Sequence, residues 1–432
     1  MNYAQALAYL NDHASYETSG RIESPTLARM QSLMDAAGQP QLSYPVIHIT
    51  GTNGKGSTSE MITQLLMSYG LVVGTYRSPH LERVNERVTR NDEPISDEEF
   101  AEQIAAVADL EALSGTRPTY FEAMTTAAYR WFADVAVDVA VIEVGLLGRW
   151  DATNVADAQV AVVTNIGLDH MEFAGPSKAD IAREKAGIVK PNSAVVIGEA
   201  DPDLAQIFLD AGGATAFVRG EDFDVLDNLL ALGGRMVDLR TPTTIYPEVY
   251  IPLHGSHQGD NAAVALMAVE AFFASPPPGE LVTEAFASVE MPGRFEILGR
   301  QPLVIVDGAH NPAGADVCSS VFFDDFNPEG RRLLVVGCLR GRDPAEMLAA
   351  LRADEFDTVF VATAPSPRGL PADVLAKAAR QVGCDHVVSC TTVEQACDRA
   401  LHGADGDDAI LIAGSLYVVG AARPYVQRHG TG

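Results

Sequence analysis

The sequence is poor in positive charge. It has 30 Lys and Arg residues against 58 Asp and Glu residues, which gives a formal net charge of −28 at pH 7. This deficit excludes a broad nucleic-acid or anionic-membrane surface, because either would need a basic footprint. An acidic small molecule is still possible as a ligand, provided that the few cations gather at one place.

Cysteine is also scarce. The number of cysteines is odd and no CxxC pair occurs, a pattern that favours reduced structural thiols over a metal or redox site. The five cysteines all lie in the last third of the chain: Cys318, Cys338, Cys384, Cys390 and Cys397.

Long hydrophobic runs are absent as well. No stretch reaches the roughly 18 apolar residues that a membrane span requires, and residues 1–20 lack the basic and apolar regions of a secretory signal. We therefore expect a cytoplasmic protein with no membrane segment. With 432 residues, of which 47% are hydrophobic, the chain can bury sizeable cores and is expected to form two or three domains.

Short apolar runs alternate with amphipathic stretches such as residues 58–70. This alternation indicates buried parallel strands joined by crossover helices, and hence an α/β doubly wound sheet. The strand-like runs of the first series are residues 45–50, 71–76, 137–144, 158–166 and 193–198.

The pattern changes at about residue 222 to strands and turns, and residues 259–275 then return to a helical pattern. Pro292 and Gly293 break the chain in residues 291–298, which predicts a domain boundary there, with domains 1–293 and 294–432. A second alternating series follows the break: residues 302–312, 332–341, 357–369, 384–390 and 408–420.

Residues 48–58, HITGTNGKGST, lie between an expected strand and an expected helix. Backbone N–H groups and the helix dipole bind phosphate in this geometry. The glycines let the backbone approach phosphate oxygens, Lys55 can reach a terminal phosphate, and Ser57 or Thr58 can face Mg²⁺. The segment departs from the usual phosphate loop, since Ile49 stands where the first Gly should be and Gly56 separates Lys55 from Ser57. The alternative is a tight Gly-Asn turn with a solvated Lys.

Two further residues are candidates for metal binding. Glu143 ends a very apolar strand, where a carboxylate is costly unless it meets a cation, so a metal ligand at the carboxyl edge of the sheet competes with a surface carboxylate. His170 follows the next strand at the same edge and is either structural or a ligand.

The spelling GTNGKGS resembles the phosphate loop of the Mur ligase superfamily, and the Gly before Ser57 resembles its folylpolyglutamate synthase/dihydrofolate synthase branch. The resemblance runs from about residue 45 to 420. It implies a P-loop-containing Mur-ligase-type central domain with a mostly parallel sheet, and a smaller Rossmann-like C-terminal domain. Further segments in family order are residues 76–88, 119–125, 141–154, 164–175, 181–191, 259–265, 291–296, 307–312 and 414–417.

The resemblance also implies roles for individual residues. Lys55, Lys185 and His310 would be catalytic, with Lys185 carbamylated; from the residues alone, Lys185 reads as a solvated Lys in a charged run. Two Mg²⁺ ions would be held by Ser57, Ser78, Glu143 and His170. ATP would be bound by Thr52, Asn53, Gly54, Lys55, Gly56, Ser57, Thr58, Asn261, Arg294 and Asp307. The substrates would be bound by Tyr120, Phe121, Glu122, Arg149, Asp151, His310 and Ser415, of which His310 and Ser415 would position glutamate.

The sequence departs from the family pattern in two places. Leu147 stands where the family usually has Gly, and a Leu there would be strained if the position needs a positive φ. Residues 17–30 replace an apolar segment that often helps to bind the pterin. Both places bear on the choice of pteroate substrate.

Four arginines, Arg77, Arg83, Arg87 and Arg90, lie close together in this acidic chain. They could face an acidic substrate tail. They could equally pair with Glu82, Glu86 and the acidic residues of 92–99, since exposed ion pairs are common.

The reaction that the resemblance implies is ATP-dependent ligation of L-glutamate to a folate, and possibly to 7,8-dihydropteroate, through an acyl phosphate. We expect a monomer that handles only small molecules. Two alternatives remain: another amino-acid ligase of the superfamily, and a nucleotide-binding paralogue that has lost catalysis.

Overall fold

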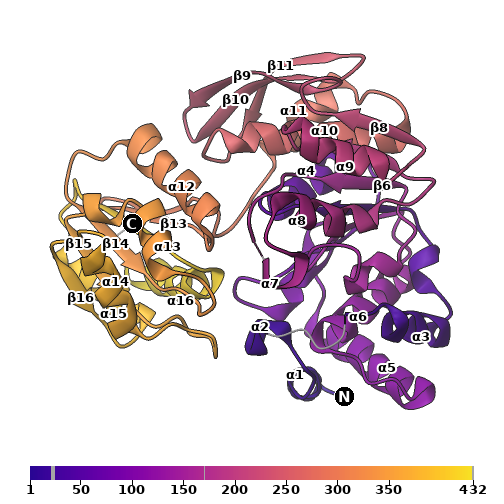
Figure 1. Cartoon of the computed structure of the whole chain (residues 1–432), viewed down its shortest axis with the longest axis horizontal. Helices are drawn as coiled ribbons and strands as arrows, with labels where there is room; N and C mark the ends of the chain where they lie inside the picture. Colours follow the sequence, from indigo (N-terminus) through magenta and orange to yellow (C-terminus); the bar gives the residue numbers. More distant parts are fainter. Residues whose placement is uncertain (21–24, 170, 431–432) are drawn as a thin grey trace. The chain divides into compact units, whose positions relative to one another are not determined.

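The computed structural model describes residues 1–20, 25–169 and 171–430, which form two compact units. The first unit contains the described residues of Met1–Tyr16, Arg21–Pro252 and Ser256–Glu290 (Figure 1). The second contains those of Glu17–Gly20, Leu253–Gly255 and Met291–Gly432. Each unit has its own hydrophobic core.

A largely parallel sheet forms the centre of the first unit. Its strands, as far as the structure describes them, follow the order β4-β3-β2-β5-β1-β6-β7-β8, and pairing is parallel from β2 to β8. Every residue of β1, β2, β5 and β6 is buried, as expected for strands covered on both faces. Their bounds are β1 (Val46–Thr50), β2 (Val73–Tyr76), β3 (Val88–Arg90), β4 (Glu93–Pro94), β5 (Val139–Glu143), β6 (Val160–Val163), β7 (Ala194–Ile197) and β8 (Thr215–Val218).

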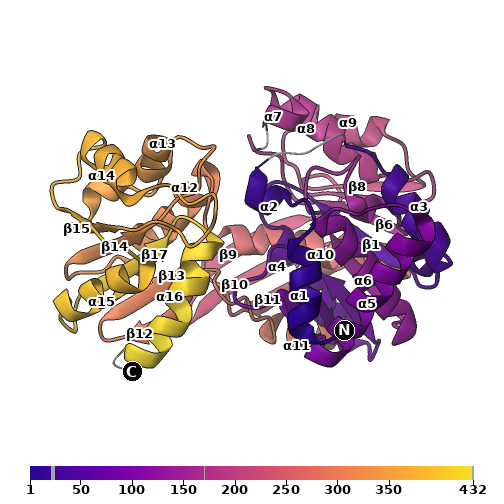
Figure 2. The same cartoon turned by 90° about the horizontal axis from the view of Figure 1, so that it is seen from below.

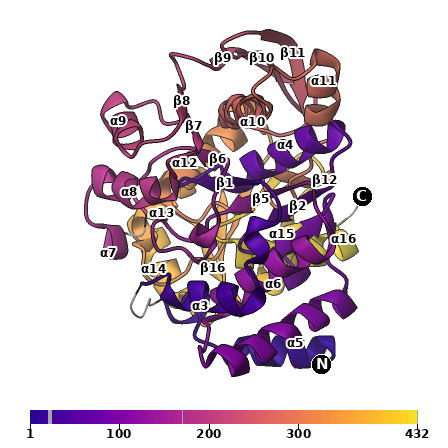
Figure 3. The same cartoon turned by 90° about the vertical axis from the view of Figure 1, so that its right-hand side faces the viewer.

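Helices cover both faces of this sheet. Figure 3 shows α4 and α10 on one face and α3, α5 and α6 on the other. The helices up to residue 290 are α1 (Tyr3–Asn11), α2 (Tyr16–Ser19), α3 (Ala28–Ala37), α4 (Lys55–Ser68), α5 (Asp97–Ser114), α6 (Tyr120–Asp134), α7 (Met171–Ala174), α8 (Lys178–Lys185), α9 (Pro202–Asp210), α10 (His257–Phe273) and α11 (Gly279–Ala287). Short 3-10 turns are η1 (Pro40–Leu42), η2 (Val84–Arg87), η3 (Ala152–Val155) and η4 (Ala186–Ile188).

The strand-and-turn insert folds as a small antiparallel sheet in the order β11-β10-β9, which confirms the change of pattern seen at residue 222. Its strands are β9 (Asp224–Ala231), β10 (Gly234–Arg240) and β11 (Ile245–Ile251). The helix α10, which follows it, returns the chain to the central sheet and is predicted well by the apolar run that starts near residue 259.

The second unit is a separate α/β sheet in the order β12-β13-β17-β14-β15-β16, with an antiparallel β12 at its edge. Figure 2 shows α12, α13 and α14 on one face of this sheet and α15 and α16 on the other. The strands are β12 (Glu296–Arg300), β13 (Leu303–Val306), β14 (Arg332–Val336), β15 (Thr358–Val361), β16 (Val387–Ser389) and β17 (Ala409–Ala413). The helices are α12 (Pro312–Ser320), α13 (Pro344–Ala350), α14 (Ala372–Gln381), α15 (Val393–Gly403) and α16 (Leu416–His429), with the π-helical η5 (Val321–Phe326) and the 3-10 turn η6 (Ala353–Glu355).

Both expected series of strands are therefore present, and the α/β fold class is confirmed. The expected runs overestimate strand length, because the polar ends of runs such as 137–144 already belong to turns. The five cysteines are free and buried in the second unit.

Candidate active site

The phosphate loop connects the end of β1 to the start of α4, as the sequence predicts. Gly54 caps α4 with a φ of 82°, in the left-handed region that favours glycine. A Cβ atom on Gly54 would lie 2.4 Å from Oδ1 of Asn261, a residue of α10. The loop thus needs glycine at this position both for its backbone conformation and for the close approach of Asn261.

Residues after β6 hold the loop in place. The backbone N–H groups of Thr52 and Asn53 donate to the carbonyl and side-chain oxygens of Asn165, at 2.9 and 3.0 Å. The hydroxyl of Thr164 donates to the carbonyl of Asn53 at 2.6 Å. The first part of the loop is therefore fixed by the chain itself, while Ser57 and Thr58 lie in the first turn of α4.

Two lysines meet beneath the loop. Nζ of Lys55 donates to the carbonyls of Gly51 and Thr52 at 3.1 and 3.2 Å, and Nζ of Lys185 donates to the same Gly51 carbonyl at 2.6 Å. Burial, and then the charge of Lys55, lower the pKa of Lys185 well below its usual range, although Asp169 and Asp151 act in the opposite direction. The neutral amine of Lys185 is thereby favoured. Lys185 is 4% exposed, so the interpretation of a solvated Lys is wrong.

Three of the expected metal ligands, Ser57, Ser78 and Glu143, lie near the carboxyl edge of the sheet. Glu143 ends β5, is buried, and is in register with Ile49 of β1. Ser78 follows β2, and Ser57 is buried at the start of α4. His170 lies outside the described residues. Within the described residues there is no group of three His, Cys, Asp or Glu side chains suited to a metal.

Leu147 has a φ of 58°, so the strain expected from a Leu at this position is present. Its carbonyl accepts a hydrogen bond from the hydroxyl of Thr50 at 2.5 Å. The side chain packs against the apolar cluster that includes Ile166 and Ile181. These contacts offset the cost of the left-handed backbone.

Asp151 and Arg149 share the loop with Leu147 but differ in environment. The buried Asp151 accepts hydrogen bonds from its own chain, including the backbone N–H of Leu146 at 2.8 Å. Burial raises the pKa of Asp151. The side chain of Arg149 is 48% exposed and contacts Glu184 at 3.4 Å.

Tyr120, Phe121 and Glu122 begin α6. Glu122 is buried, caps the helix by accepting the N–H of Thr119 at 2.7 Å, and pairs with Arg29 at 2.9 Å. This carboxylate therefore already anchors α6 and α3. Of residues 17–30, the segment expected to affect pterin binding, positions 21–24 lie outside the described residues.

Ion pairing accounts for part of the arginine cluster. Arg77 contacts the buried Glu60 of α4 and also Asp92 at 3.0 Å, and Arg83 contacts Asp97 at 2.7 Å. Arg87 is buried and donates from Nε to Nδ1 of His80 at 2.9 Å, with its guanidinium 5.5 Å from the ring centre of Tyr120. Arg77 and Arg83 thus form ion pairs with acidic residues of the chain, as one of the two interpretations predicts. Arg87 is instead buried.

In the second unit, Asp307 follows β13 and accepts the backbone N–H groups of Phe295 and Ala309, both at 2.8 Å. Burial raises the pKa of Asp307, and the nearby Arg294 opposes this rise. Nδ1 of His310 donates to the carbonyl of Gly308 at 2.9 Å, because a carbonyl can only accept.

Ser415, also in the second unit, is buried and caps α16 by accepting the N–H of Val418 at 3.2 Å. Arg294, Asp307, His310 and Ser415 thus belong to the second unit, and the other predicted site residues that the structure describes belong to the first.

No role for His48 or Thr153 was predicted from the sequence. Nε2 of the fully buried His48 lies 2.8 Å from the hydroxyl of Thr153. A histidine in the middle of the otherwise apolar run 45–50 was the available signal.

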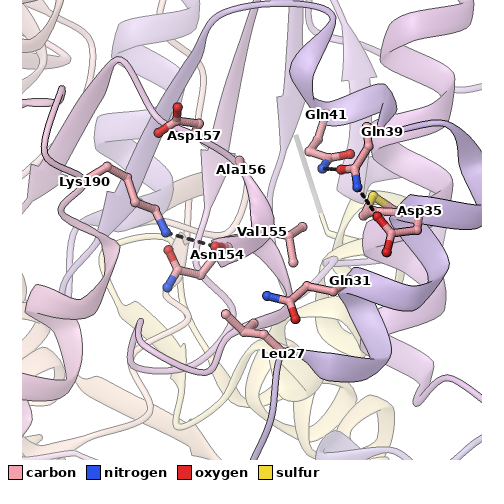
Figure 4. A pocket seen from close by; sticks show the side chains of 11 residues that line it. Leu27, Gln31, Asp35, Gln39, Gln41, Asn154, Val155, Ala156, Asp157 and Lys190 are labelled. Atoms are coloured by element: carbon pink, nitrogen blue, oxygen red, sulfur yellow. Dashed lines mark hydrogen bonds between the residues drawn. The ribbon is translucent and has the colours of Figure 1, made fainter.

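A cavity of about 490 Å³, which is lined by no residue of the phosphate loop, was not predicted either (Figure 4). Residues of α3 and η1 form one side of it, and residues 154–157 with Lys190 form the other. Lys190 donates to the carbonyl of Asn154 at 3.1 Å across this second side.

Two family models match the chain. One is the Mur ligase middle domain, over residues 49–269, and the other is the Mur ligase glutamate ligase domain, over residues 293–416. A search for long apolar helices among the described residues finds none that could span a membrane.

Two curated bacterial relatives match over most of their length. The dihydrofolate synthase/folylpolyglutamate synthase of Mycobacterium tuberculosis is 39% identical, with 92% of this chain and 89% of the relative covered. The enzyme of the same name from Escherichia coli K12 is 35% identical, with 87% and 85% covered.

Two solved structures are similar to this chain over nearly its whole length. Mycobacterium tuberculosis folylpolyglutamate synthase complexed with ADP has a TM-score of 0.88 and 36% identity, with 98% of this chain and 97% of that chain covered. Escherichia coli FolC in complex with DHPP and ADP has a TM-score of 0.88 and 31% identity, with 100% and 99% covered.

Proposed function

This chain belongs to the folylpolyglutamate synthase/dihydrofolate synthase family of the Mur ligases, and we propose that the residues around its phosphate loop carry out the reaction of that family. The chain is an ATP-dependent ligase that forms a C–N bond between L-glutamate and a folate. The observation that carries the assignment to this site is the meeting of Lys55 and Lys185 at the Gly51 carbonyl of the loop.

We propose that the reaction proceeds in two steps. A folate carboxylate attacks the γ-phosphate of ATP, which releases ADP and leaves an acyl phosphate. The amino group of glutamate then attacks the acyl carbon, and phosphate leaves. A free carboxylate is a poor acyl donor, so phosphorylation supplies the leaving group. Lys55 neutralises charge that spreads over the transferred phosphoryl group.

The nucleotide is bound mainly by the loop and the start of α4. Backbone N–H groups at the N-terminus of α4 face phosphate, with the helix dipole behind them. Thr52, Asn53, Gly54, Gly56, Ser57 and Thr58 form this cradle. Asn261 supports it, since its side chain lies against Gly54.

Mg²⁺ fits the donors at the edge of the sheet. Ser57, Ser78 and Glu143 provide the hard oxygen atoms that Mg²⁺ prefers, and the register of Glu143 with Ile49 brings the carboxylate next to the strand that carries the loop. When bound, the ion neutralises phosphate charge. His170 is kept as a further proposed ligand, and two ions as the proposed number.

We further propose that Lys185 is carbamylated. Its neutral amine adds to the carbon of CO₂, and the departing proton leaves a carbamate anion. Burial favours the neutral amine that this reaction needs. The carbamate would also bring a negative charge close to Lys55, where the structure has two amines at one carbonyl.

The second unit is proposed to handle glutamate. His310 and Ser415 would position the amino acid, while Arg294 and Asp307 would contact the nucleotide. We propose that the boundary between the ATP-binding domain and the glutamate-binding domain lies between residues 293 and 294. Tyr120, Phe121, Glu122, Arg149 and Asp151 are proposed for the folate side; the partners of Glu122 and Asp151 favour a supporting role for these two carboxylates.

One assay tests the function. The protein is incubated with Mg-ATP and labelled glutamate, and is offered tetrahydrofolate, a one-carbon folate or dihydropteroate in parallel. Glutamate incorporation with a folate is expected, together with ADP release. Incorporation with dihydropteroate would add dihydrofolate synthase activity, which the names of several relatives favour. No incorporation with any acceptor would contradict the proposed function.

The protein is also proposed to be a cytoplasmic monomer. Five free, buried thiols fit a reducing compartment. Sedimentation velocity and cell fractionation test these two points.

A further inference from the structure

His48 is an unusual residue for its position. It lies in the middle of β1, between β5 and β6, with 0% of its surface exposed. Its strand neighbours Ile47 and Ile49 are apolar, as a doubly covered strand requires. A buried polar ring is costly unless it is hydrogen-bonded, so the partner of His48 is the point of interest.

The partner is the hydroxyl of Thr153, which lies 2.8 Å from Nε2 of His48. This hydroxyl donates its only hydrogen to Oδ1 of Asp151 at 2.5 Å. It must therefore accept from His48, which places the proton on Nε2. The three side chains form a directional chain from β1 through Thr153 to Asp151.

Asp151 in turn closes the loop of residues 145–151. Its carboxylate accepts the backbone N–H of Thr153 at 3.0 Å, the N–H of Leu146 at 2.8 Å, and the N–H of Gly145. Together with the Thr153 hydroxyl, these donors occupy roughly all four acceptor positions of a carboxylate. The shape of the loop is thus set by Asp151, and Asp151 is set by Thr153.

A second bond joins the same two segments. The hydroxyl of Thr50, at the end of β1, donates to the carbonyl of Leu147 at 2.5 Å. The next residue, Gly51, begins the phosphate loop and accepts from both lysines. The strand that leads into the phosphate loop is therefore tied to the 145–151 loop at two positions, Leu147 directly and Asp151 through Thr153.

We propose that His48 and Thr153 are positioning residues that fix the 145–151 loop relative to the phosphate loop, so that the acceptor carboxylate meets the γ-phosphate. The proposal rests on the proposed function for the assignment of this loop to the folate side. Neither residue contacts substrate; both act through Asp151.

The test uses Thr153→Val, which keeps the shape of the side chain and removes the hydroxyl. Thr153→Ser, by contrast, keeps the hydroxyl. Thr75→Val is the matched control, because Thr75 is also fully buried and shares a hydroxyl–hydroxyl bond with Thr63 at 2.8 Å, and Thr63 keeps the Ser59 carbonyl as a partner.

We expect Thr153→Val to raise the KM for folate about tenfold, with the Kd for ADP by calorimetry unchanged, as the loss of a buried hydrogen bond predicts. Thr153→Ser and Thr75→Val should stay close to wild type in both quantities. Equal loss of folate and nucleotide affinity, or an unchanged KM for folate, would overturn the proposal.

Hydrogen exchange provides a readout that does not depend on activity. The amides of Gly145, Leu146 and Thr153 should exchange faster in Thr153→Val and not in the control, and unchanged protection would also overturn the proposal. If the amides exchange faster in Thr153→Val but the wild-type protein ligates glutamate to no acceptor, the positioning role stands and only the proposed function is contradicted. If Thr153→Val does not fold, His48→Gln, which keeps a side-chain donor, is compared with His48→Leu in the same experiments, and only His48→Leu should loosen the loop.

Discussion

Leu147 holds its backbone in the left-handed region while its side chain packs on an apolar cluster. Backbone and side chain therefore contribute with opposite signs, and substitutions can separate them. In Leu147→Ala the strain remains and the packing is lost. In Leu147→Gly the packing is lost but the strain is relieved.

We therefore predict that Leu147→Gly is more stable than Leu147→Ala by about 1 kcal/mol, because a left-handed conformation costs an L residue about 1–2 kcal/mol. This is opposite to the order found at ordinary positions. Urea unfolding of the two variants measures the difference. A more stable Ala variant would mean that position 147 relaxes to a negative φ.

His48 should make stability depend on pH. Burial, and then Lys190, lower the pKa of His48 from 6.5 to about 3. The unfolded chain therefore binds a proton that the folded chain does not. The contribution of His48 to the free energy of unfolding is fully present above the pKa that it has in the unfolded chain. This contribution is lost as the pH falls toward the pKa that His48 has in the folded protein.

We predict that His48 alone lowers the unfolding free energy by about 2 kcal/mol between about pH 7.5 and about pH 5. Comparison of wild type with His48→Gln, by urea unfolding at several pH values, isolates this contribution from the carboxylates. Identical pH dependence in the two proteins would show that His48 is not neutral and buried in solution.

Lys185 is the residue whose chemistry the proposed carbamate depends on. We predict that Lys185→Ala lowers turnover at least about a hundredfold, because the variant would lack the negative charge and the oxygen ligands of the proposed carbamate. Added acetate or formate should restore part of the activity by supplying a carboxylate. In the wild type, ¹³C-labelled bicarbonate should give a carbamate resonance that is absent from the variant. Turnover like wild type in Lys185→Ala would remove the carbamate from the mechanism.

Helix α4 shows how an element depends on the residue that caps it. Gly54 and Gly70 flank this helix with φ values of 82° and 78°. A Cβ on Gly54 would meet Asn261 at 2.4 Å, whereas a Cβ on Gly70 would meet nothing within 4 Å. The two glycines are thus a matched pair, equal in backbone strain and different in surroundings.

We predict that Gly54→Ala weakens ADP binding at least about tenfold, whereas Gly70→Ala lowers stability by about 1 kcal/mol and leaves ADP binding unchanged. Calorimetric titration of both variants with Mg-ADP, together with their unfolding curves, checks this. Equal affinities would mean that the loop adapts to a side chain at position 54.

The segment that follows β2 is held from α4 by a buried ion pair. Glu60 of α4 is fully buried and contacts Arg77, the residue before Ser78. A buried carboxylate without its cation is strongly destabilising. The helix that starts at the phosphate loop therefore also supports the position proposed for a metal ligand.

At the scale of the whole molecule, each unit has a large apolar cluster of its own among the described residues. The large cluster of the second unit is built from residues between Phe295 and Ala413, whereas that of the first is built from residues between Ala6 and Ala158. Each unit thus has the core that an autonomous domain requires.

We predict that a fragment of residues 291–432 unfolds cooperatively by itself and binds no ADP. Circular dichroism during thermal unfolding and calorimetry with Mg-ADP check the two parts. A fragment without a cooperative transition would show that the second unit needs the first one in order to fold.

The acidity of the chain gives the two lysines at the phosphate loop their importance. With a net charge of −28, the protein repels anionic substrates over most of its surface. Lys55 and Lys185 are placed together at one carbonyl. The spacing of Lys55 within the Gly-rich loop was readable, but the approach of Lys185, 130 positions further along the chain, was not.

The sequence by itself determined the alternation of strands and helices, the phosphate loop and the family, because these depend on local periodicity and on letters in a fixed order. It also predicted strain at Leu147 if that position has a positive φ, because the family that the sequence resembles usually has Gly there. Only the tertiary structure decided that Lys185 is buried beside Lys55, that Glu122 pairs with Arg29, and that His48 reaches Asp151 through Thr153. Such contacts join segments that are distant along the chain, and the burial that shifts a pKa or requires a hydrogen bond exists only after those segments have packed.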